Sequence, residues 1–270
     1  MVPGTTNPTA AGGMEPRLKR AVLLSAGQGR RLLPLTADRP KCALEFRGRT
    51  FVEWQIDALF DAGIEDVTVV LGYGVDLVER LLGERYAGAA VRTLYNPFYR
   101  LADNLATCWS ARAAMDDDFL LINGDTLFEV DIVRHLVAGA TAPITVTIDH
   151  KDAYDADDMK VIRDGAGRPR RIGKQLPAEE VSAEAIGLTA FTGTGPVLFK
   201  EAVARALRRD DGLSLWYPSV LDELARTGEV AAWSVGSRRW SEMDDHDDLA
   251  AVEAVAAALE GAQAADNVCG

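Results

Sequence analysis

The sequence predicts an α/β fold with a Rossmann-like sheet, mixed but mostly parallel, sandwiched between helices. Short apolar runs with the length of buried strands alternate with helix-length amphipathic segments over residues 21–95. Glycines stand at the ends of several of these segments. An alternation of this kind joins parallel strands through helices and leaves a ligand crevice where the strands end.

Each early element has its own signal. The strands are expected at 21–24, 67–71 and 91–95. A helix over 51–63 follows Thr50, a residue suited to cap a helix N-terminus, and its apolar residues recur at helical spacing. A second helix over 75–82 is expected to end at Gly83.

The later elements are interpreted in the same way. The apolar run 119–123 indicates a buried strand, whereas residues 150–184 have the charged, proline- and glycine-containing composition of hairpins. Further helices are expected at 105–115, 132–137, 196–209, 215–226 and 247–259, and further strands at 144–148, 159–163, 170–174, 184–193 and 230–235.

We expect one domain with two flexible ends. Residues 1–16 are rich in Gly, Pro, Thr and Ala and lack the apolar core of a signal peptide, so they are interpreted as a flexible tail. Residues 17–260 form the domain, and its substrate-side lobe, about 126–235, grows from the same sheet. Residues 261–270 are expected to be a second flexible tail.

Composition excludes several classes of protein. The chain of 270 residues has 29 Lys and Arg against 41 Asp and Glu, a net charge of −12, which argues against a general binder of nucleic acid or anionic membranes. No apolar run approaches the length of a membrane span. Cys42, Cys108 and Cys269 are scattered and odd in number, as expected for reduced thiols, so we place the protein in the cytoplasm.

A glycine-broken turn follows the first strand and predicts a polyphosphate site. Gly27 and Gly29 have no side chains, so the backbone there can approach an anion closely. Arg31 adds a bidentate positive group, and Lys41 adds a point charge. The expected phosphate-binding residues are Ser25, Ala26, Gly27, Gln28, Gly29, Arg30, Arg31 and Lys41.

Two other glycine loops are excluded. The dinucleotide fingerprint requires a third glycine where Leu32 stands, and no acidic residue ends the strand 67–71. The ATPase-type phosphate loop requires Gly-Lys-Ser/Thr, which does not occur in the chain.

Two groups of carboxylates predict a magnesium site. Asp125 follows an apolar strand and a glycine, so its side chain should emerge at the edge that carries the glycine-rich turn. Glu242 and Asp244 precede the last helix, and Asp247 and Asp248 are better suited to the N-terminus of that helix. Mg²⁺ binds one or two carboxylates together with substrate phosphate oxygens.

Four separated motifs occur in a recognisable order: G-x-G-x-R with P-K, an apolar strand ending in Gly-Asp, Ile-Gly-Lys, and W-x-E-M-D-x-x-x-D-L. Over roughly residues 19–260 the chain resembles the sugar-phosphate nucleotidylyltransferase superfamily. The segments NPFYRLADNLATCWSAR, DDMKVI and SLWYPSVLDEL are most similar to the cytidylyltransferases that act on phosphocholine and on aminoalkyl phosphonates.

The resemblance implies a fold of the nucleotide-diphospho-sugar transferase type and a role for each matching residue. Gly27, Gly29 and Arg31 would hold the nucleotide phosphates, and Lys41 would neutralise charge at the α-phosphate. Asp125 and Asp244 would bind Mg²⁺, with Glu242 as helper. Asn104 would bind the base, with Gly72 and Tyr73 nearby. Lys174 and Gly187 would bind the acceptor, and Lys160 is a further candidate for that role. The family pattern is broken at Ser25 and at Asp245, and the latter leaves open which aspartate carries the metal.

The implied reaction transfers a nucleoside monophosphate, CMP from CTP above all, to a small phosphorylated or phosphonate acceptor and releases pyrophosphate. Trp216 and Tyr217 are candidates for an aromatic wall around a trimethylammonium group, whereas carboxylates of residues 152–158 are candidates for holding a primary amine. A sugar- or cyclitol-1-phosphate nucleotidylyltransferase using another NTP, and a non-catalytic nucleotide-binding protein, stay as alternatives. A homodimer is possible, because the family often forms dimers.

Overall fold

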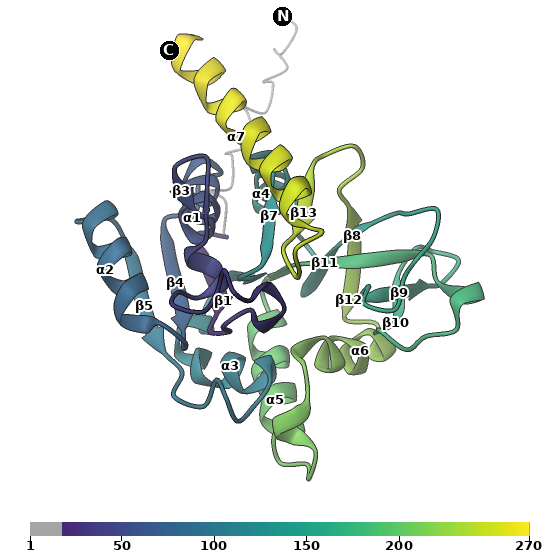
Figure 1. The fold of residues 1–270 in the computed structure, drawn as a ribbon. Helices are drawn as coiled ribbons and strands as arrows, with labels where there is room; N and C mark the ends of the chain where they lie inside the picture. The colour runs from purple at the N-terminus through teal and green to yellow at the C-terminus, as the bar shows by residue number, and fades with distance from the viewer. Residues whose placement is uncertain (1–17, 270) are drawn as a thin grey trace, which may run out of the picture.

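A nine-stranded sheet crosses the molecule from β5 at one end to β9 and β10 at the other (Figure 1). The computed structural model describes residues 18–269, and side chains for residues 18–261. The strands of this sheet are β1 (Arg20–Ser25), β4 (Asp66–Leu71), β5 (Val91–Tyr95), β6 (Phe119–Asn123), β8 (Ile144–Asp149), β9 (Lys160–Arg163), β10 (Pro169–Gly173), β11 (Ala183–Phe191) and β12 (Val230–Ser234). The proposed tail at 1–16 lies outside the described residues.

The sheet is mixed, and most of its strands share one direction. β5, β4, β1 and β6 pair in parallel, and so do β8 and β12. β11 runs antiparallel to its neighbours β6, β8 and β9, and β10 is antiparallel to β9. Only β11 and β10 of the strands in this sheet are therefore reversed, which confirms the predicted mixed, mostly parallel fold class.

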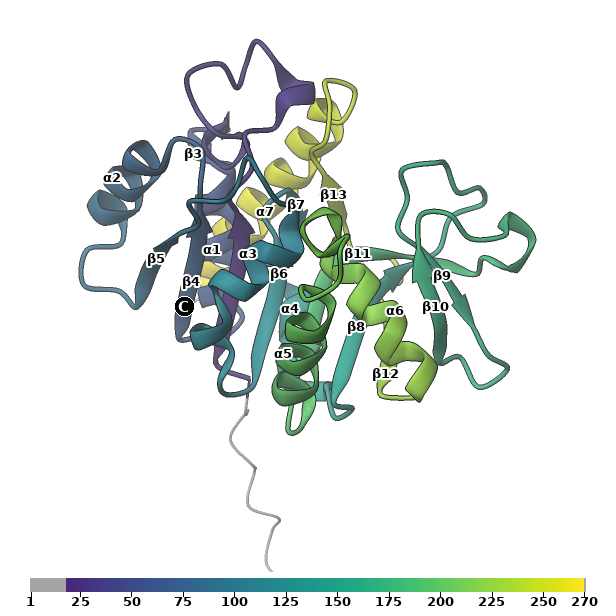
Figure 2. The same ribbon diagram turned by 90° about the horizontal axis from the view of Figure 1, so that it is seen from below.

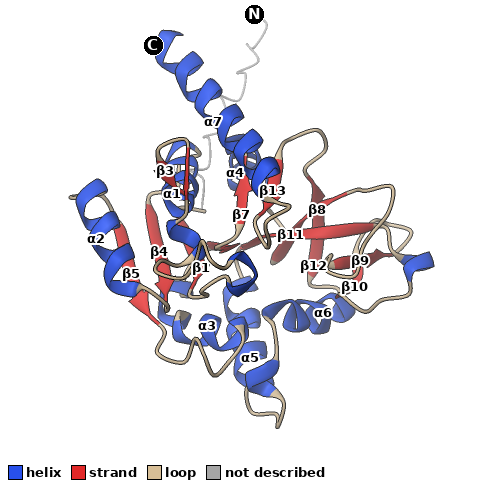
Figure 3. Ribbon diagram, viewed as in Figure 1, coloured by secondary structure: helices blue, strands red, loops and turns tan. Residues whose placement is uncertain are grey.

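Helices cover both faces of the sheet, as the predicted alternation requires (Figure 3). The helices are α1 (Phe51–Asp61), α2 (Val75–Arg85), α3 (Asn104–Ser110), α4 (Val130–Gly139), α5 (Gly195–Ala206), α6 (Tyr217–Thr227) and α7 (Leu249–Cys269). One face of the sheet packs against α1, α2 and α4, and the other, turned toward the viewer in Figure 2, packs against α3, α5 and α6. None of the helices in the described part of the chain is long and apolar enough to cross a bilayer.

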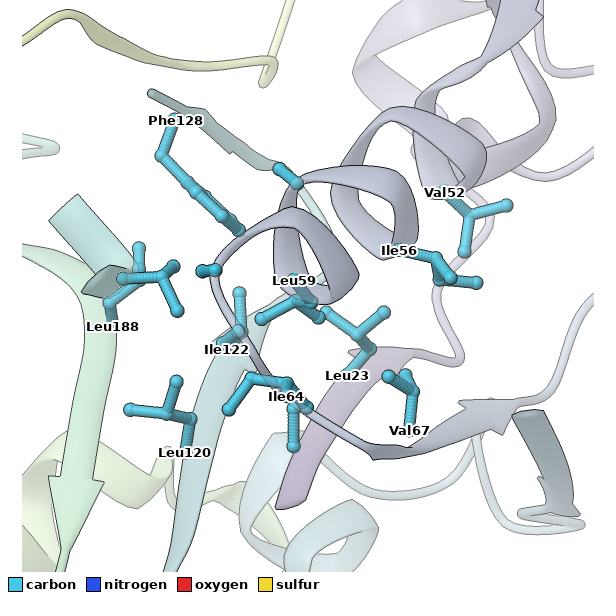
Figure 4. Packing of buried hydrophobic residues seen from close by; sticks show 14 of the residues in the cluster. Leu23, Val52, Ile56, Leu59, Ile64, Val67, Leu120, Ile122, Phe128 and Leu188 are labelled. Carbon is cyan, nitrogen blue, oxygen red and sulfur yellow. The ribbon is translucent and has the colours of Figure 1, made fainter. Parts of the chain in front are cut away.

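The two-sided burial explains why the first strand is apolar without alternation. Val22 and Leu23 are both buried, but they belong to the cores on opposite faces of the sheet. Figure 4 shows Leu23 and Ile122 beneath α1, whose Ile56 and Leu59 point toward the strands. These side chains hold the carboxyl end of β1, where the glycine-rich turn begins, against a rigid support.

The helix ends follow the predicted signals in most places. Thr50 and Glu53 form a capping box at the start of α1, with the Thr50 amide 2.6 Å from the Glu53 carboxylate. Gly83 does not end α2, which continues to Arg85. The helix expected over 105–115 is divided into α3 and a 3₁₀ turn, and α7 is longer than expected. Its helical backbone enters the 261–270 segment, whose flexibility stays a prediction.

A small antiparallel ribbon, absent from the sequence-based expectation, stands beside the main sheet. It pairs β7 (Thr126–Phe128) with β13 (Trp240–Glu242). A third apolar core packs α7 and α1 against this ribbon, through Val252 and Ala256 of α7, Trp54 of α1 and Leu127 of β7. The ribbon therefore joins the end of the chain to the segment that follows β6 (Figure 1).

Candidate active site

The glycine-rich turn at residues 25–29, called the signature loop below, is held against Lys41. The Lys41 amide donates to the Gln28 carbonyl oxygen at 3.1 Å. Gly29 has φ +79°, and a Cβ on it would lie 2.8 Å from the Lys41 Cβ. The Gln28 side chain donates to the Thr36 carbonyl oxygen at 3.0 Å, which pins the loop from the other side. Glycine at position 29 is thus required for Lys41 to reach the site.

Gly72 and Tyr73 support the signature loop from behind. The Tyr73 amide donates to the Ala26 carbonyl oxygen at 3.1 Å, and the Tyr73 hydroxyl donates to the Ala37 carbonyl oxygen at 2.6 Å. A Cβ at Gly72 would lie 2.5 Å from the Ala26 carbonyl oxygen, so only glycine permits this approach. Their part in reading the base stays a prediction.

Lys41 joins the two predicted metal carboxylates. Its Nζ lies 2.9 Å from Asp125 Oδ2 and 3.1 Å from Asp244 Oδ1. Arg31 Nη2 lies 2.8 Å from Asp244 Oδ2. The four residues predicted to be catalytic, Arg31, Lys41, Asp125 and Asp244, therefore meet in one place although they come from three distant segments.

The pKa values of Lys41 and Asp244 are shifted by the charges of the residues that they contact. Burial alone would lower the pKa of Lys41, but Asp125 and Asp244 outweigh it and raise that pKa. Burial alone would raise the pKa of Asp244, but Lys41 and Arg31 outweigh it and lower that pKa. At neutral pH the lysine is therefore positive and Asp244 negative.

The β7–β13 ribbon determines which aspartate faces the site. The Met243 amide donates to the Asp125 carbonyl oxygen at 2.9 Å, so the segment after β13 lies beside Asp125. Asp244 then points to Lys41, whereas Asp245 accepts a hydrogen bond from the Asp247 amide at 2.9 Å. Asp248 accepts hydrogen bonds from the amides of Asp244 and Asp245, and therefore holds the turn. Of these two aspartates, Asp244 is therefore the one that faces Lys41 and Asp125, and its role as a metal ligand stays a prediction.

The residues present fit a magnesium ion. Within the described residues, Asp125 Oδ1 is buried and accepts no hydrogen bond. Two carboxylates that already share one cation, Lys41, are an oxygen donor set of the kind Mg²⁺ prefers. Burial, followed by the charges of Asp125 and Asp244, raises the pKa of Glu242 to about 8. In residues 18–261 no group of three or more His, Cys, Asp or Glu side chains forms a metal cluster, so substrate oxygens would complete the coordination.

Two cavities meet at Asp125. The first, of about 220 Å³, is bounded by the signature loop and is called the loop cavity; it is lined by Leu24, Ser25, Gly27, Gly29, Lys41, Cys42, Asn104, Asn123, Gly124 and Asp125. The second, of about 200 Å³, opens toward β9–β11 and is called the lobe cavity. Asn104, Asn123 and Asp125 line both cavities. The arrangement therefore offers two binding spaces on either side of one carboxylate.

The lobe cavity is lined by four of the predicted acceptor residues. Lys174 and Gly187 both line it, and Trp216 forms part of its wall. The Lys174 ammonium lies 4.6 Å from the centre of the Trp216 ring, so it already covers one face of that ring. Gly187 has φ +76°, and a Cβ there would lie 2.6 Å from the Asn123 side chain, so this position requires glycine.

Tyr217, the fourth of these residues, lines the lobe cavity but exposes little of its surface there. It is almost fully buried, and its ring packs edge-on against Phe199 in the core. Its hydroxyl donates to Asn123 Oδ1 at 2.9 Å, and its amide donates to Asn104 Oδ1 at 2.8 Å. Tyr217 therefore orients the two asparagines that line both cavities, and Asn104 has a fixed side-chain orientation.

Lys160 does not reach either cavity, so the structure does not support it as an acceptor ligand. The side chain is 6% exposed. Its ammonium donates to the carbonyl oxygens of Asp155, Asp158 and Lys174, at 3.4 Å for Asp158 and 3.1 Å for Lys174. Lys160 is thus a buried link between the 155–158 turn and the end of β10.

Sequence reasoning missed two residues of the site. Asn123 lines both cavities. The one sequence feature that could have indicated this role is its position at the end of the apolar strand β6. Asp157 was not separated from its acidic neighbours, but it contacts Arg31 Nη1 at 3.1 Å and Lys174 Nζ at 3.2 Å. Runs of acidic residues are usually solvated, and nothing in the sequence of this run indicated that Asp157 contacts Arg31 and Lys174.

Residues 21–225 match the family model of the MobA-like NTP transferase domain. The chain belongs to this family. The match includes the signature loop, Lys41, Asp125 and Lys174, whereas Asp244 lies beyond it.

Relatives of this MobA-like NTP transferase include two proteins named for cytidylyl chemistry. A CTP:phosphoglutamine cytidylyltransferase of Campylobacter jejuni is 27% identical over 187 residues, which is 64% of this chain and 72% of the relative. A CMP-5'-(3-aminopropyl)phosphonate synthase of Streptomyces rubellomurinus is 33% identical over 123 residues, which is 46% of this chain but only 20% of the relative. These matches confirm the predicted resemblance to the nucleotidyltransferase superfamily.

Solved structures show the same fold. The inositol-1-phosphate CTP transferase from T. maritima superposes with a TM-score of 0.76 at 22% identity, covering 92% of this chain and 98% of that protein. The CTP:phosphocholine cytidylyltransferase from Streptococcus pneumoniae has a TM-score of 0.68 at 18% identity, covering 87% and 98%. The nucleotide-diphospho-sugar transferase type of fold is thereby confirmed.

Proposed function

We propose that this MobA-like NTP transferase moves CMP from CTP to a small phosphorylated or phosphonate acceptor, such as phosphocholine or 2-aminoethylphosphonate. The observation that carries the proposal is the pair of cavities that meet at Asp125. Lys41 lies on the loop-cavity side, and Lys174 lies on the lobe-cavity side. A reaction between two phosphate-bearing anions needs this distribution of positive charge.

In the proposed reaction, an acceptor oxygen attacks the α-phosphorus of CTP in line. A bond forms between that oxygen and the α-phosphorus, the bond from the α-phosphorus to its bridging oxygen breaks, and pyrophosphate leaves with the electron pair. The attacking oxygen is already anionic, so no general base is required. Within the described residues, no histidine lines the loop cavity or the lobe cavity.

The residues of the site would hold the reactants and balance their charge. The signature loop and Arg31 would bind the nucleotide phosphates, Lys41 the α-phosphate, and Lys174 the acceptor anion. Asp125 and Asp244 would hold Mg²⁺, with Glu242 beside them, and the ion would offset charge on the phosphate oxygens. Lys41 would exchange its two carboxylate partners for phosphate oxygens when the substrates bind.

A pyrophosphate-release screen tests the function. The four NTPs are each combined with phosphocholine, 2-aminoethylphosphonate, inositol phosphate and hexose 1-phosphates, with and without Mg²⁺. We expect release with CTP and phosphocholine or 2-aminoethylphosphonate, and only when Mg²⁺ is present. The Asp125→Asn variant is the negative control.

The other outcomes of the screen have definite meanings. Activity on a sugar phosphate or inositol phosphate, with no activity on phosphocholine or 2-aminoethylphosphonate, would overturn the choice of acceptor. NTP binding without turnover on any acceptor would favour a nucleotide-binding protein.

We expect the reaction to take place in the cytoplasm, because the three scattered cysteines suit a reducing compartment. A homodimer stays a prediction, for which light scattering is the test.

A further inference from the structure

Asp157 forms ion pairs with two cations of the candidate site: Arg31, proposed above for the nucleotide phosphates, and Lys174, proposed for the acceptor. One carboxylate oxygen lies 3.1 Å from Arg31 Nη1, and the other lies 3.2 Å from Lys174 Nζ. These hydrogen bonds and charges, those of Lys174 first, hold the pKa of Asp157 below its usual value. The carboxylate is therefore an internal anion placed where an acceptor phosphate would otherwise interact.

The position of Asp157 is built into its turn. The Asp157 amide donates to Asp155 Oδ1 at 2.9 Å, and the Asp155 amide donates to Asp158 Oδ2 at 2.9 Å. Buried Lys160 binds the carbonyl oxygens of the same turn and of Lys174. The turn and the Lys174 backbone are thus joined by one ammonium, so Asp157 and Lys174 face each other across a fixed frame.

A third cavity, of about 600 Å³, lies beyond Asp157 and is called the acidic cavity. Asp157 lines both the acidic cavity and the lobe cavity, so it stands on the boundary between them. The walls of the acidic cavity are rich in carboxylates, among them Asp155, Asp158, Glu184, Asp245 and Asp248. In the described part of the chain, Glu184 is 3% exposed and its Oε1 is buried without a hydrogen-bond partner. Lys151, which also lines this cavity, pairs with Asp158 at 3.0 Å and with Glu184 Oε2 at 2.7 Å, so these two carboxylates already have a cation.

We propose that Asp157 selects an acceptor that carries a primary ammonium near its phosphate or phosphonate. The inference rests on the proposed function and narrows its acceptor class. Such an acceptor is a zwitterion, and it can be inserted into the Lys174–Asp157 ion pair. The anionic group of the acceptor would bind Lys174, and its ammonium would bind Asp157 on the side of the acidic cavity. Each protein charge exchanges one partner for another, so neither is left unpaired.

A primary ammonium suits this site better than a trimethylammonium group. Carboxylates bind an ammonium through its N–H donors, which a trimethylammonium lacks. The usual site for a trimethylammonium is an open aromatic face. Here Lys174 covers one face of Trp216, and Tyr217 lines the lobe cavity but is only 2% exposed. The aromatic wall that a choline group needs is therefore incomplete.

Steady-state kinetics with matched acceptors test the proposal. 2-Aminoethylphosphonate and ethylphosphonate share the phosphonate, and only the first carries an ammonium; phosphocholine supplies the trimethylammonium. For the wild-type enzyme we expect the lowest KM with 2-aminoethylphosphonate. Asp157→Asn should raise that KM about 10-fold to 100-fold, because a charged hydrogen bond is lost. The KM for ethylphosphonate should stay the same or fall, because Arg31 and Lys174 lose their internal competitor.

Glu180→Gln is the matched control, since it removes one exposed carboxylate from the same lobe and should change neither KM. Asp157 is exposed, so a thermal melt of the variant should match the wild type. If Asp157→Asn lowers both KM values equally, Asp157 is only a competitor for the cations, and the inference is wrong. It is also wrong if neither KM changes. If no acceptor supports pyrophosphate release with any NTP, the proposed function itself has failed.

Discussion

The backbone amide of Met243 donates a hydrogen bond to the carbonyl oxygen of Asp125, across 2.9 Å. This contact continues the β7–β13 ribbon by one residue and brings Asp244 to the same ammonium that binds Asp125. The two carboxylates are therefore positioned by the backbone, and their separation does not depend on flexible side chains alone. A site that must hold a small cation with fixed coordination benefits from such support.

The first prediction concerns Asp125→Asn. The substitution keeps the shape of the side chain but removes the charge that would hold Mg²⁺, so kcat should fall on the order of 100-fold or more. Asp131→Asn, on the exposed side of α4, is the control and should keep full activity. Steady-state pyrophosphate release measures both. Turnover of Asp125→Asn within a few-fold of wild type would show that the site is wrongly assigned.

The second prediction concerns Lys41→Met without substrate. The change leaves Asp125 and Asp244 facing each other without their shared cation, so the free energy of unfolding should fall by on the order of 2 kcal/mol in the absence of divalent ions. Mg²⁺ should then stabilise the variant more than the wild type, because in the variant the ion does not compete with the Lys41 ammonium for Asp125 and Asp244. Thermal melts with EDTA and with Mg²⁺ measure the difference.

The control for this experiment is the double variant Lys41→Met with Asp244→Asn. It should recover part of the lost stability and lose the response to Mg²⁺, because one of the two repelling carboxylates is gone. An equal response of wild type, single variant and double variant to Mg²⁺ would argue against a metal site at these carboxylates.

The third prediction separates backbone strain from close contact at Gly187. Gly187 and Gly193 both have positive φ, +76° and +59°, so alanine at either position should cost about 1–2 kcal/mol of stability. Only at Gly187 would the new methyl also meet the Asn123 and Thr126 side chains, at 2.6 and 2.8 Å. Gly187→Ala should therefore lose more stability than Gly193→Ala and raise the acceptor KM. Equal urea denaturation curves for the two variants would contradict the packing described here.

The fourth prediction concerns pH. Burial raises the pKa of Glu184 from 4.5 to about 7, although Lys151 opposes the shift and Asp158 adds to it. The folded protein thus prefers the protonated carboxyl of Glu184. Its contribution to the free energy of unfolding is therefore complete below pH 4.5 and is lost as the pH rises to about 7. The loss is on the order of 3 kcal/mol.

Glu184→Gln should remove this pH dependence, because glutamine is neutral throughout. The free energy of unfolding in urea, compared between about pH 4.5 and about pH 7.5, should fall less for the variant than for the wild type. The same fall in both proteins would show that Glu184 titrates normally.

Elements with a strong local signal could be predicted from the sequence. The buried run at β1 and the capping box of Thr50 and Glu53 each act within a few residues, so their pattern is readable. Gly124 could also be recognised from the sequence, because it stands between an apolar run and Asp125. The predicted residues on these elements therefore lie together at the candidate site, and their roles stay predictions.

The elements that were missed depend on contacts across the fold. β7 and β13 have three residues each, too few for a periodic pattern, and each is a strand only because the other lies beside it. Lys160 looks like a solvated strand lysine until the 155–158 turn closes over it. Gly83 is tolerated inside α2, so a glycine alone did not define the end of that helix.

The late position of β13 in the chain has a consequence for synthesis. A nascent polypeptide that has left the ribosome only as far as residue 235 can form every strand of the main sheet, but β7 has no partner. Asp125 is then present without Asp244, and the core under α7 is still open. A partial product of this length therefore lacks one of the two carboxylates that bind Lys41, so the candidate site is completed only near the end of synthesis.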